Sequence, residues 1–371
     1  MSHTKTLLLV LVLALAFTAC GGADDMASTA GSAPVSGTPP APPSPPSPPA
    51  PPAPPPPLGS QDFATRRAQP GVLRSVGFDA VSDITGGYGD NSGITTGAAT
   101  PSLDNSVKAS GAGSLKFTIP PFSGADTSGT YFTNFSSDLL LQFGENQEFY
   151  VQWRQRFSPE FLNTVYAGGG GWKQIIISTG DKPGCTRSSS ASGLCYSSCT
   201  ELETVANNPN QLGFPQMYNS CAGSSWHGAF EGLYEPFGAS DFKLQNARVS
   251  PYCLYSQSGA GHFPPAGNCF AYVANEWMTF QIRIQTGPRN NDGWTGSRVT
   301  LWVARENQPS ELVIDRPIVL NAGSAAADQK FGKVWLLPYN TGKSSAQDHP
   351  TAFTWYDELI ISRTRIADPA P

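Results

Sequence analysis

The sequence predicts an all-β protein whose main domain is a two-sheet β-sandwich. Charged residues make up only 14% of the chain, whereas glycine (38) and aromatic residues (20 Phe, 12 Tyr, 8 Trp) are frequent, which favours short strands and tight turns over long helices. Segments of alternating apolar and polar residues recur and are bounded by Gly, Pro, Asn and Asp. No repeat of fixed period is visible, which argues against a propeller or a solenoid.

Residues 1–19 have the pattern of an export signal. Lys5 precedes an apolar run from Leu7 to Phe17, which is shorter than the roughly 20 residues of a membrane-spanning helix. Residues 17–20, Phe-Thr-Ala-Cys, resemble the lipobox of bacterial lipoproteins. The resemblance implies that Cys20 is lipidated and that the protein is an outer-membrane lipoprotein facing the periplasm or the cell surface. An ordinary cleaved signal with an incidental cysteine is the alternative.

Residues 20–71 are expected to form the lipidated N-terminus and a stalk. Between Pro39 and Pro57 the chain is almost only Pro, Ala and Ser, a composition that forms polyproline II and cannot bury a core. At about 3.1 Å per residue this segment is a spacer of roughly 60 Å. A proline-rich ligand for a recognition module is the alternative.

Residues 72–371 are expected to form the β-sandwich. In the segment from Ser114 to Ile119, Leu115, Phe117 and Ile119 share one face, and the same alternation is found in 149–157 and 279–285. Such two-faced segments predict antiparallel strands. Further strands are expected at Trp172–Ser178, Arg298–Ala304, Leu312–Ile314, Lys333–Leu337 and Trp355–Ser362.

The segment from about 179 to 268 predicts a disulfide-stapled loop insertion, with one or two short strands such as Glu201–Val205, that forms a wall or lid over one sheet. Six cysteines lie in this segment or at its border. They are Cys185, Cys195, Cys199, Cys221, Cys253 and Cys269. An even number in an exported chain predicts three disulfides, whose pairing stays open. A zinc site at Cys195 and Cys199 is the alternative.

The charge pattern and the missing motifs exclude several classes of function. The net charge is −5 and no run of Lys or Arg occurs, so nucleic acid is not an expected partner. The chain has no Gly-x-Ser-x-Gly elbow, no His-Glu-x-x-His motif and no phosphate-binding loop. Serine hydrolase, metalloprotease and nucleotide chemistry are therefore not expected.

Five segments resemble the concanavalin A-like jelly rolls of bacterial polysaccharide lyases and lectin-like domains. They are Gly113–Phe117, Phe149–Phe161, Gly171–Ile175, Glu276–Phe280 and Trp355–Ile361. The resemblance implies that the polar face of a curved sheet holds a polysaccharide. Alginate lyases of this fold have an Arg-rich strand, a Gln-x-His strand and a Tyr/Lys-rich strand. The corresponding residues here are Arg154 with Arg156, Gln174 without the histidine, and Tyr339 within Lys333–Lys343.

This resemblance predicts a lyase that cleaves an acidic polysaccharide by β-elimination, a reaction that needs a group to neutralise the carboxylate, a base and an acid. We assign these three roles to Arg154, to His227 and to Tyr339. Residues expected to bind substrate are Arg156, Lys173, Gln174, Arg283 and Trp226. Tryptophans can stack on sugar rings, and lysines and arginines can pair with carboxylates.

Two other functions fit the same fold. One is a non-catalytic glycan-binding or adhesion lipoprotein, and the other is a glycoside hydrolase with Glu201 and Glu203 as its carboxylates. No cofactor is required for any of the three. Asp357 together with Asp79 could hold a structural calcium ion, as related jelly rolls often do. The domain is expected to be a monomer that contacts the membrane only through the lipid.

Overall fold

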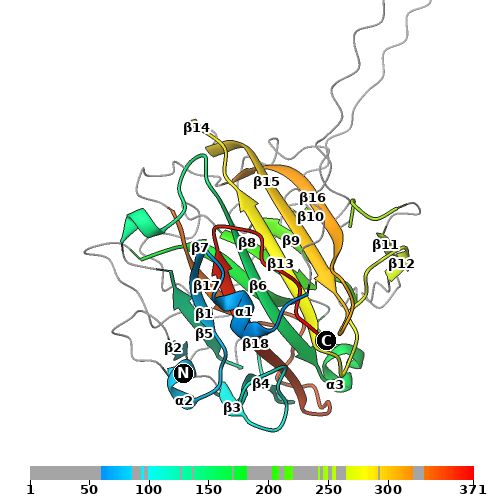
Figure 1. Ribbon diagram of the computed structural model, residues 1–371. Helices are drawn as coiled ribbons and strands as arrows, with labels where there is room; N and C mark the ends of the chain where they lie inside the picture. Colours follow the sequence, from blue (N-terminus) through cyan, green and yellow to red (C-terminus); the bar gives the residue numbers. More distant parts are fainter. Residues whose placement is uncertain are drawn as a thin grey trace, which may run out of the picture. The chain divides into compact units, whose positions relative to one another are not determined.

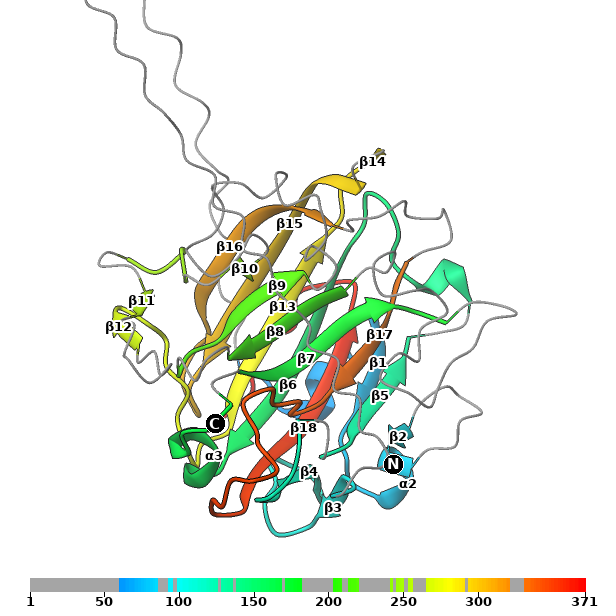
Figure 2. The same cartoon turned by 180° about the vertical axis from the view of Figure 1, so that it is seen from behind.

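The computed structural model describes residues 60–85, 93–95, 99–125, 128–135, 138–168, 171–181, 203–208, 213–219, 241–242, 245–249, 253–255, 265–290, 293–320 and 330–371. All of them belong to the compact unit Pro55–Pro371. Strands dominate this part of the chain, and they form two large antiparallel sheets that stack face to face (Figures 1 and 2). The predicted all-β jelly-roll sandwich is confirmed.

The front sheet, nearer the viewer in Figure 1, has the order β14-β15-β13-β6-β18-β4-β3, with β1 beside β18 and β16 beside β15. Its strands are β1 Val72–Val76, β3 Ser102–Asp104, β4 Ser114–Ile119, β6 Glu148–Phe157, β13 Met278–Gln285, β14 Arg289–Asn290, β15 Gly293–Ala304, β16 Glu311–Leu320 and β18 Ala352–Ser362. The short helices are α1 Phe63–Arg67, α2 Val81–Thr85 and α3 Pro159–Asn163, with a 3₁₀ turn at Leu139–Leu141.

The back sheet, nearer the viewer in Figure 2, has the order β10-β9-β8-β7-β17-β5-β2. Its strands are β2 Gly93–Thr95, β5 Thr130–Asn134, β7 Trp172–Thr179, β8 Glu203–Asn208, β9 Gln216–Asn219, β10 Asp241–Phe242 and β17 Phe331–Leu336. A separate pair contains β11 Cys253–Tyr255 and β12 Pro265–Gly267.

An aromatic layer fills the space between the two sheets. Phe157 of the front sheet lies 5.4 Å from Trp172 of the back sheet, and Phe149 lies 5.5 Å from Phe331, measured between ring centroids. All four rings are almost fully buried. Large aromatic side chains contribute most to such cores because each removes a large apolar area from water. This layer fixes how the two sheets sit on each other.

The insertion contributes more to the fold than the sequence analysis expected. Three of its strands, β8, β9 and β10, extend the back sheet, and two more form the pair β11 and β12. The expected strand Glu201–Val205 is β8, displaced to Glu203–Asn208. The prediction of one or two short strands was wrong because period-two alternation is weak in this segment, whereas pairing with β7 supplies the order.

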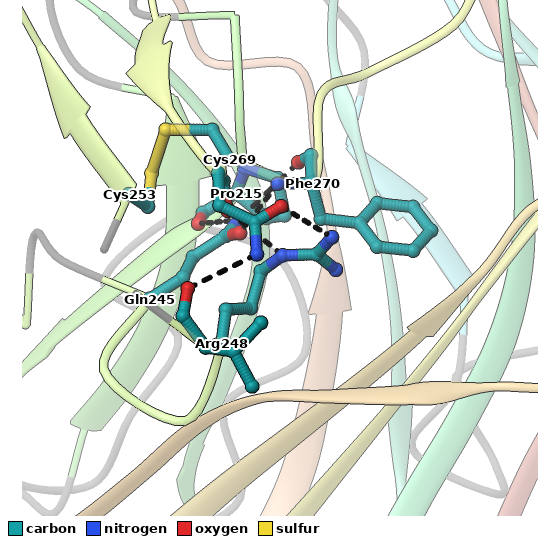
Figure 3. The surroundings of a disulfide bond; sticks show 8 residues. Pro215, Gln245, Arg248, Cys253, Cys269 and Phe270 are labelled. Atoms are coloured by element: carbon teal, nitrogen blue, oxygen red, sulfur yellow. Dashed lines mark hydrogen bonds between the residues drawn. A yellow bond between two sulfur atoms is a disulfide. The ribbon is translucent and has the colours of Figure 1, made fainter. Parts of the chain in front are cut away.

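One predicted disulfide lies in the described part of the chain and joins Cys253 to Cys269 (Figure 3). Beside it, Gln245 accepts a hydrogen bond from the backbone N–H of Phe270 at 2.6 Å and donates to the carbonyls of Pro215 and Phe270. These bonds tie the disulfide-bonded pair to the loop before β9. Cys185, Cys195, Cys199 and Cys221 lie outside the described residues, as do Cys20 and the stalk.

The outer face of the front sheet is closed by the two ends of the described chain. Helix α1 contributes Arg66, which is fully buried, pairs with Glu358 of β18 and donates a hydrogen bond to Gln152 of β6. The backbone of Gln61 also pairs with residues 368–370 of the C-terminal segment.

Among the helices that the structure describes, none combines the length and hydropathy that a membrane span requires.

We expect Arg66→Met to lower the free energy of unfolding by about 3–5 kcal/mol, because it leaves Glu358 buried without its main partner. A urea titration followed by tryptophan fluorescence measures the change. Arg67→Met is the matched control, since Arg67 is the next residue of α1 and is exposed. A loss from Arg66→Met no larger than that from the control would contradict this role.

Candidate functional site

The outer face of the back sheet carries an apolar cluster of Phe132, Ile176, Trp335, Leu337 and Tyr339, called here the outer cluster. Trp335 of β17 is in register with Phe132 of β5 on one side and with Ile176 of β7 on the other. Residues directly opposite each other on neighbouring strands share a face of the sheet. The Phe132 and Trp335 rings lie 5.4 Å apart, so these strands build one continuous aromatic surface.

The accessible end of this surface lies at Tyr339. Trp335, Phe132 and Leu337 are buried, whereas Ile176 and Tyr339 are half-buried. Lys173 of β7 is also half-buried, and its Nζ lies 5.1 Å from the centroid of the Tyr339 ring. A lysine ammonium therefore lies over the ring of a half-buried tyrosine at the accessible end of the outer cluster.

Backbone contacts hold Lys173 and Tyr339 together. The Lys173 N–H donates to the Tyr339 carbonyl at 2.7 Å, and the Thr341 N–H donates to the Gly171 carbonyl at 2.8 Å. A Cβ atom on Gly168 would lie 2.7 Å from the carbonyl oxygen of Gly342, so a larger residue does not fit without a backbone shift. Gly168 and Gly171 thus let the turn after β17 approach closely to the segment before Lys173.

Toward the start of β17 the same face becomes polar. Lys333 Nζ lies 2.6 Å from Asp181 Oδ1, and both side chains are fully buried. Lys333 also lies 5.5 Å from the Trp335 ring centroid and 5.7 Å from that of Phe132. Asn134 accepts a hydrogen bond from the Asp181 N–H, and within the described residues its buried Nδ2 has no partner. A charged pair and an amide thus adjoin the buried part of the outer cluster.

This combination of groups is suited to a sugar ligand. Carbohydrate and other small-molecule sites place a few polar groups around aromatic and apolar surface. Aromatic faces can stack on sugar rings, while ammonium groups attract carboxylates. The half-buried Lys173 and Tyr339 are the groups of this face that a ligand can reach first.

Gln174 was predicted to bind substrate, but the structure places it in the core. It lies two residues after the core residue Trp172 and so shares its inward face, and a bulge between Lys173 and Ile175 directs Ile175 into the core as well. Gln174 is fully buried, donates to Gln155 Oε1 at 2.8 Å and accepts a hydrogen bond from the hydroxyl of Tyr272. Gln174 orders the interior and does not reach the outer cluster.

Arg154, Arg156 and Arg283 lie on the front sheet, so the structure does not bring Arg154 to Tyr339. Their alternation on β6 and β13 points them to the outer face of that sheet, with the aromatic core between them and the outer cluster. Arg154 lies 3.9 Å from Glu358, Arg156 is 3.5 Å from Asn275 Oδ1, and Arg283 is 2.6 Å from Glu148. The strand pattern was correct, but it could not tell which sheet β6 joins.

Asp79 and Asp357, the expected calcium ligands, hold the loop before β4. The backbone N–H groups of Ala109 and Ser110 donate to Asp357 Oδ2, and that of Ala112 donates to Asp79 Oδ1. Burial is the main reason that the pKa of Asp357 is raised to about 8. The described residues contain no group of three or more acidic, His or Cys side chains placed to hold a metal. Calcium binding at this loop stays a prediction.

His227 and Trp226, the predicted base and sugar-stacking residue, lie outside the described residues. Glu203 is described only by its backbone, which is in register with Ser178. The site residues that sequence reasoning did not single out are Phe132, Trp335, Lys333 and Asp181. A signal existed for two of them, because Lys333 and Trp335 alternate with Val334 and Leu336 in the predicted strand 333–337.

The sequence matches no known family model and no curated protein. Solved structures that align with the chain include a marine PL-14 alginate lyase from Aplysia kurodai, with 10% identity and a TM-score of 0.46 over 78% of this chain and 98% of that chain. Alginate lyase vAL-1 from a Chlorella virus aligns with 10% identity and a TM-score of 0.40 over 79% and 100%. An immunostimulatory antigen and pseudo β-1,3-glucanase of Mycobacterium tuberculosis aligns with 13% identity and a TM-score of 0.36 over 80% and 100%. Similarity at this level does not assign an activity.

Lys343 ends the turn that carries Tyr339, and burial of its ammonium lowers its pKa to about 8. In the unfolded chain a lysine titrates near ~10.4, so between about pH 8 and 10 the folded protein holds fewer protons than the unfolded one. We therefore expect the wild type to gain stability relative to Lys343→Met as the pH rises from 7 to 10. The free energy of unfolding of both proteins at each pH measures this.

Lys108→Met is the control for the Lys343 measurement, because Lys108 is exposed. The stability difference between the wild type and Lys108→Met should stay constant over the same pH range. A constant difference for Lys343→Met as well would show that its ammonium is not desolvated by folding.

Proposed function

We propose that this protein binds an acidic polysaccharide on the outer face of the back sheet and cleaves it by β-elimination. One observation carries the proposal, namely the Lys173 ammonium above the ring of Tyr339 at the exposed border of the outer cluster. A cation and a proton donor are both needed next to a uronic acid residue, and here the half-buried Lys173 and Tyr339 supply them at one place.

In the proposed reaction Lys173 pairs with the sugar carboxylate and stabilises the charge that develops when the neighbouring C5–H bond breaks. The electron pair of that bond forms the C4=C5 double bond while the C4–O4 bond breaks. Tyr339 gives its proton to O4, and a base takes the proton from C5. His227 stays the proposed base, and the phenol is restored by proton return through water.

Lys173 takes the role that sequence analysis gave to Arg154. The two residues carry the same charge, but only Lys173 lies beside Tyr339. Arg156 and Arg283 share the outer face of the front sheet with Arg154, so they are not part of this proposal. The proposed site therefore uses one face of β7 and the turn that follows β17.

A non-catalytic glycan-binding protein is the second candidate function. It is favoured by the half-buried Ile176 and Tyr339, which leave an apolar edge of the outer cluster within reach of a ligand while the rings of Trp335 and Phe132 are buried beneath it. In either case we propose that the lipid on Cys20 and the stalk keep the domain outside the cytoplasm, where such polymers are found.

Incubation of the full-length protein with a panel of polyuronates separates the lyase from the non-catalytic glycan-binding protein, because only elimination produces unsaturated ends that absorb ultraviolet light. Glycan binding without any such product would overturn the lyase proposal.

We expect Tyr339→Phe to lower kcat on the active polymer by roughly 10²–10⁴-fold, the usual contribution of a general acid. The rate of increase in ultraviolet absorbance measures it. Tyr150→Phe is the matched control, because Tyr150 packs on Trp302 at the outer face of the front sheet. Equal rates for the wild type and Tyr339→Phe would remove Tyr339 from the mechanism.

Lys173→Met should lower kcat/KM by on the order of 10²–10³-fold, because the developing charge loses its nearest cation. Cleavage of the same polymer at several substrate concentrations gives the value. The control is Lys116→Met, since Lys116 also lies over aromatic rings, 4.5 Å from the Phe353 centroid, but on the front sheet. If both variants lose activity equally, the effect is not local to Tyr339.

A further inference from the structure

A cavity of about 250 Å³ opens beside the start of β17, at the opposite end of this strand from Tyr339. It lies between the loop before β6, the β14–β15 hairpin at the top of Figure 1, and the residue that precedes β17. Its lining residues are Gly144, Glu145, Gln147, Arg289, Trp294 and Lys330. Since β17 has six residues, its two ends lie roughly 20 Å apart at about 3.3 Å per residue.

Trp294 gives this cavity a buried donor that lacks an acceptor. The side chain is 2% exposed, and within the described part of the chain its Nε1–H has no hydrogen-bond partner. Buried indole N–H groups are normally bonded, and an unsatisfied one costs about 1–3 kcal/mol. A ligand oxygen in the cavity would recover that free energy.

Charge in the cavity favours an anion. Among the described lining residues, Arg289 and Lys330 are cationic and Glu145 is acidic, although the whole chain has a net charge of −5. Two of the acceptors are already engaged by the backbone, because Glu145 Oε1 accepts from the Arg289 N–H and Gln147 Oε1 from the Gly144 N–H. The lining therefore offers mainly donors and positive charge to a ligand.

The backbone next to the cavity continues into the outer face of the back sheet. Just after β7, the Gly180 N–H donates to the Lys330 carbonyl at 3.0 Å, and the next residue, Asp181, pairs with Lys333. A Cβ atom on Gly144 would lie 3.2 Å from the Lys330 side chain, so the glycine leaves room for that lysine. Through Lys330 the cavity thus adjoins the residues that follow β7 and precede β17, the strands that carry the proposed active face.

We infer that this cavity binds one carboxylate-bearing sugar residue, with Lys330 and Arg289 on the carboxylate and the Trp294 N–H on a sugar oxygen. The inference rests on the proposed function in that it supplies a second subsite for the same acidic polymer. A polymer held both here and at Tyr339 has to span roughly the length of β17, about 20 Å.

The test uses the indole N–H signals of the full-length protein in ¹⁵N–¹H spectra, with D-glucuronate as probe and D-glucose as its neutral counterpart. Trp294→Phe identifies the Trp294 signal, and Trp335 serves as a second reporter at the outer cluster. We expect D-glucuronate to move the Trp294 signal and D-glucose to leave it in place. Lys330→Met should weaken this response about tenfold, the effect of one charge-assisted hydrogen bond. Lys108→Met should not change it.

An unmoved Trp294 signal in the presence of D-glucuronate would overturn the inference, and so would an equal shift with D-glucose or an unchanged response in Lys330→Met. These outcomes are separate from the lyase test. A Trp294 shift in a protein that cleaves no polyuronate keeps this site and overturns the proposed reaction. Cleavage of a polyuronate without a Trp294 shift keeps the proposed reaction and overturns this site.

Discussion

The aromatic layer between the two sheets is the constraint on which the rest of the structure depends. Phe157 and Phe149 on one sheet meet Trp172 and Phe331 on the other, and all four are almost fully buried. Because side chains alternate along a strand, every residue that β7 and β17 direct into this layer sends its neighbour to the outer face. The interior packing therefore also sets the positions of Lys173, Trp335 and Lys333, and a change of register by one residue would exchange core and site.

The outer faces of the two sheets differ in how their charged residues are paired. On the front sheet the charged residues neutralise one another, since Glu358 is paired with Arg66 and lies within 3.9 Å of Arg154. Glu358 itself adopts a positive φ of 50° at the bulge of β18, which places it and Asp357 on the same face. Strained backbone of this kind persists only where the surroundings fix it, and here α1 and the C-terminal segment do so. The arginines of β6 thus serve the closure of the fold, which is why they are not in the groove that their sequence pattern suggested.

The sequence predicted where the strands lie, but not which strands pair with one another. Alternation placed the strand Ser114–Ile119 at its observed bounds, and that at Thr279–Gln285 within one residue. Alternation says which residues share a face, but not which sheet a strand joins, and so Arg154 and Lys173 could not be separated. Gln174 shares the inward face of Trp172, whereas the bulge that sends Ile175 inward as well is marked by no local pattern. The pair Lys333 and Asp181, 152 residues apart in the chain, exists only because β7 and β17 become neighbours.

Burial decides which of the lysines on and near β17, namely Lys333, Lys173 and Lys330, can contact a ligand. Lys333 is fully buried against Asp181, so its charge is already neutralised and it contributes mainly to the order of the face. Lys173 and Lys330, at the two ends, are half-buried and still in reach of solvent. A chain with net charge −5 would repel an acidic polymer at long range, but such repulsion between exposed charges is screened beyond about 8–10 Å in physiological salt. Charge recognition then falls to the two ends of the strand, because the rings of Trp335 and Phe132 between them are buried. On this arrangement a long acidic polymer gains from both ends at once, whereas a single sugar acid can occupy only one.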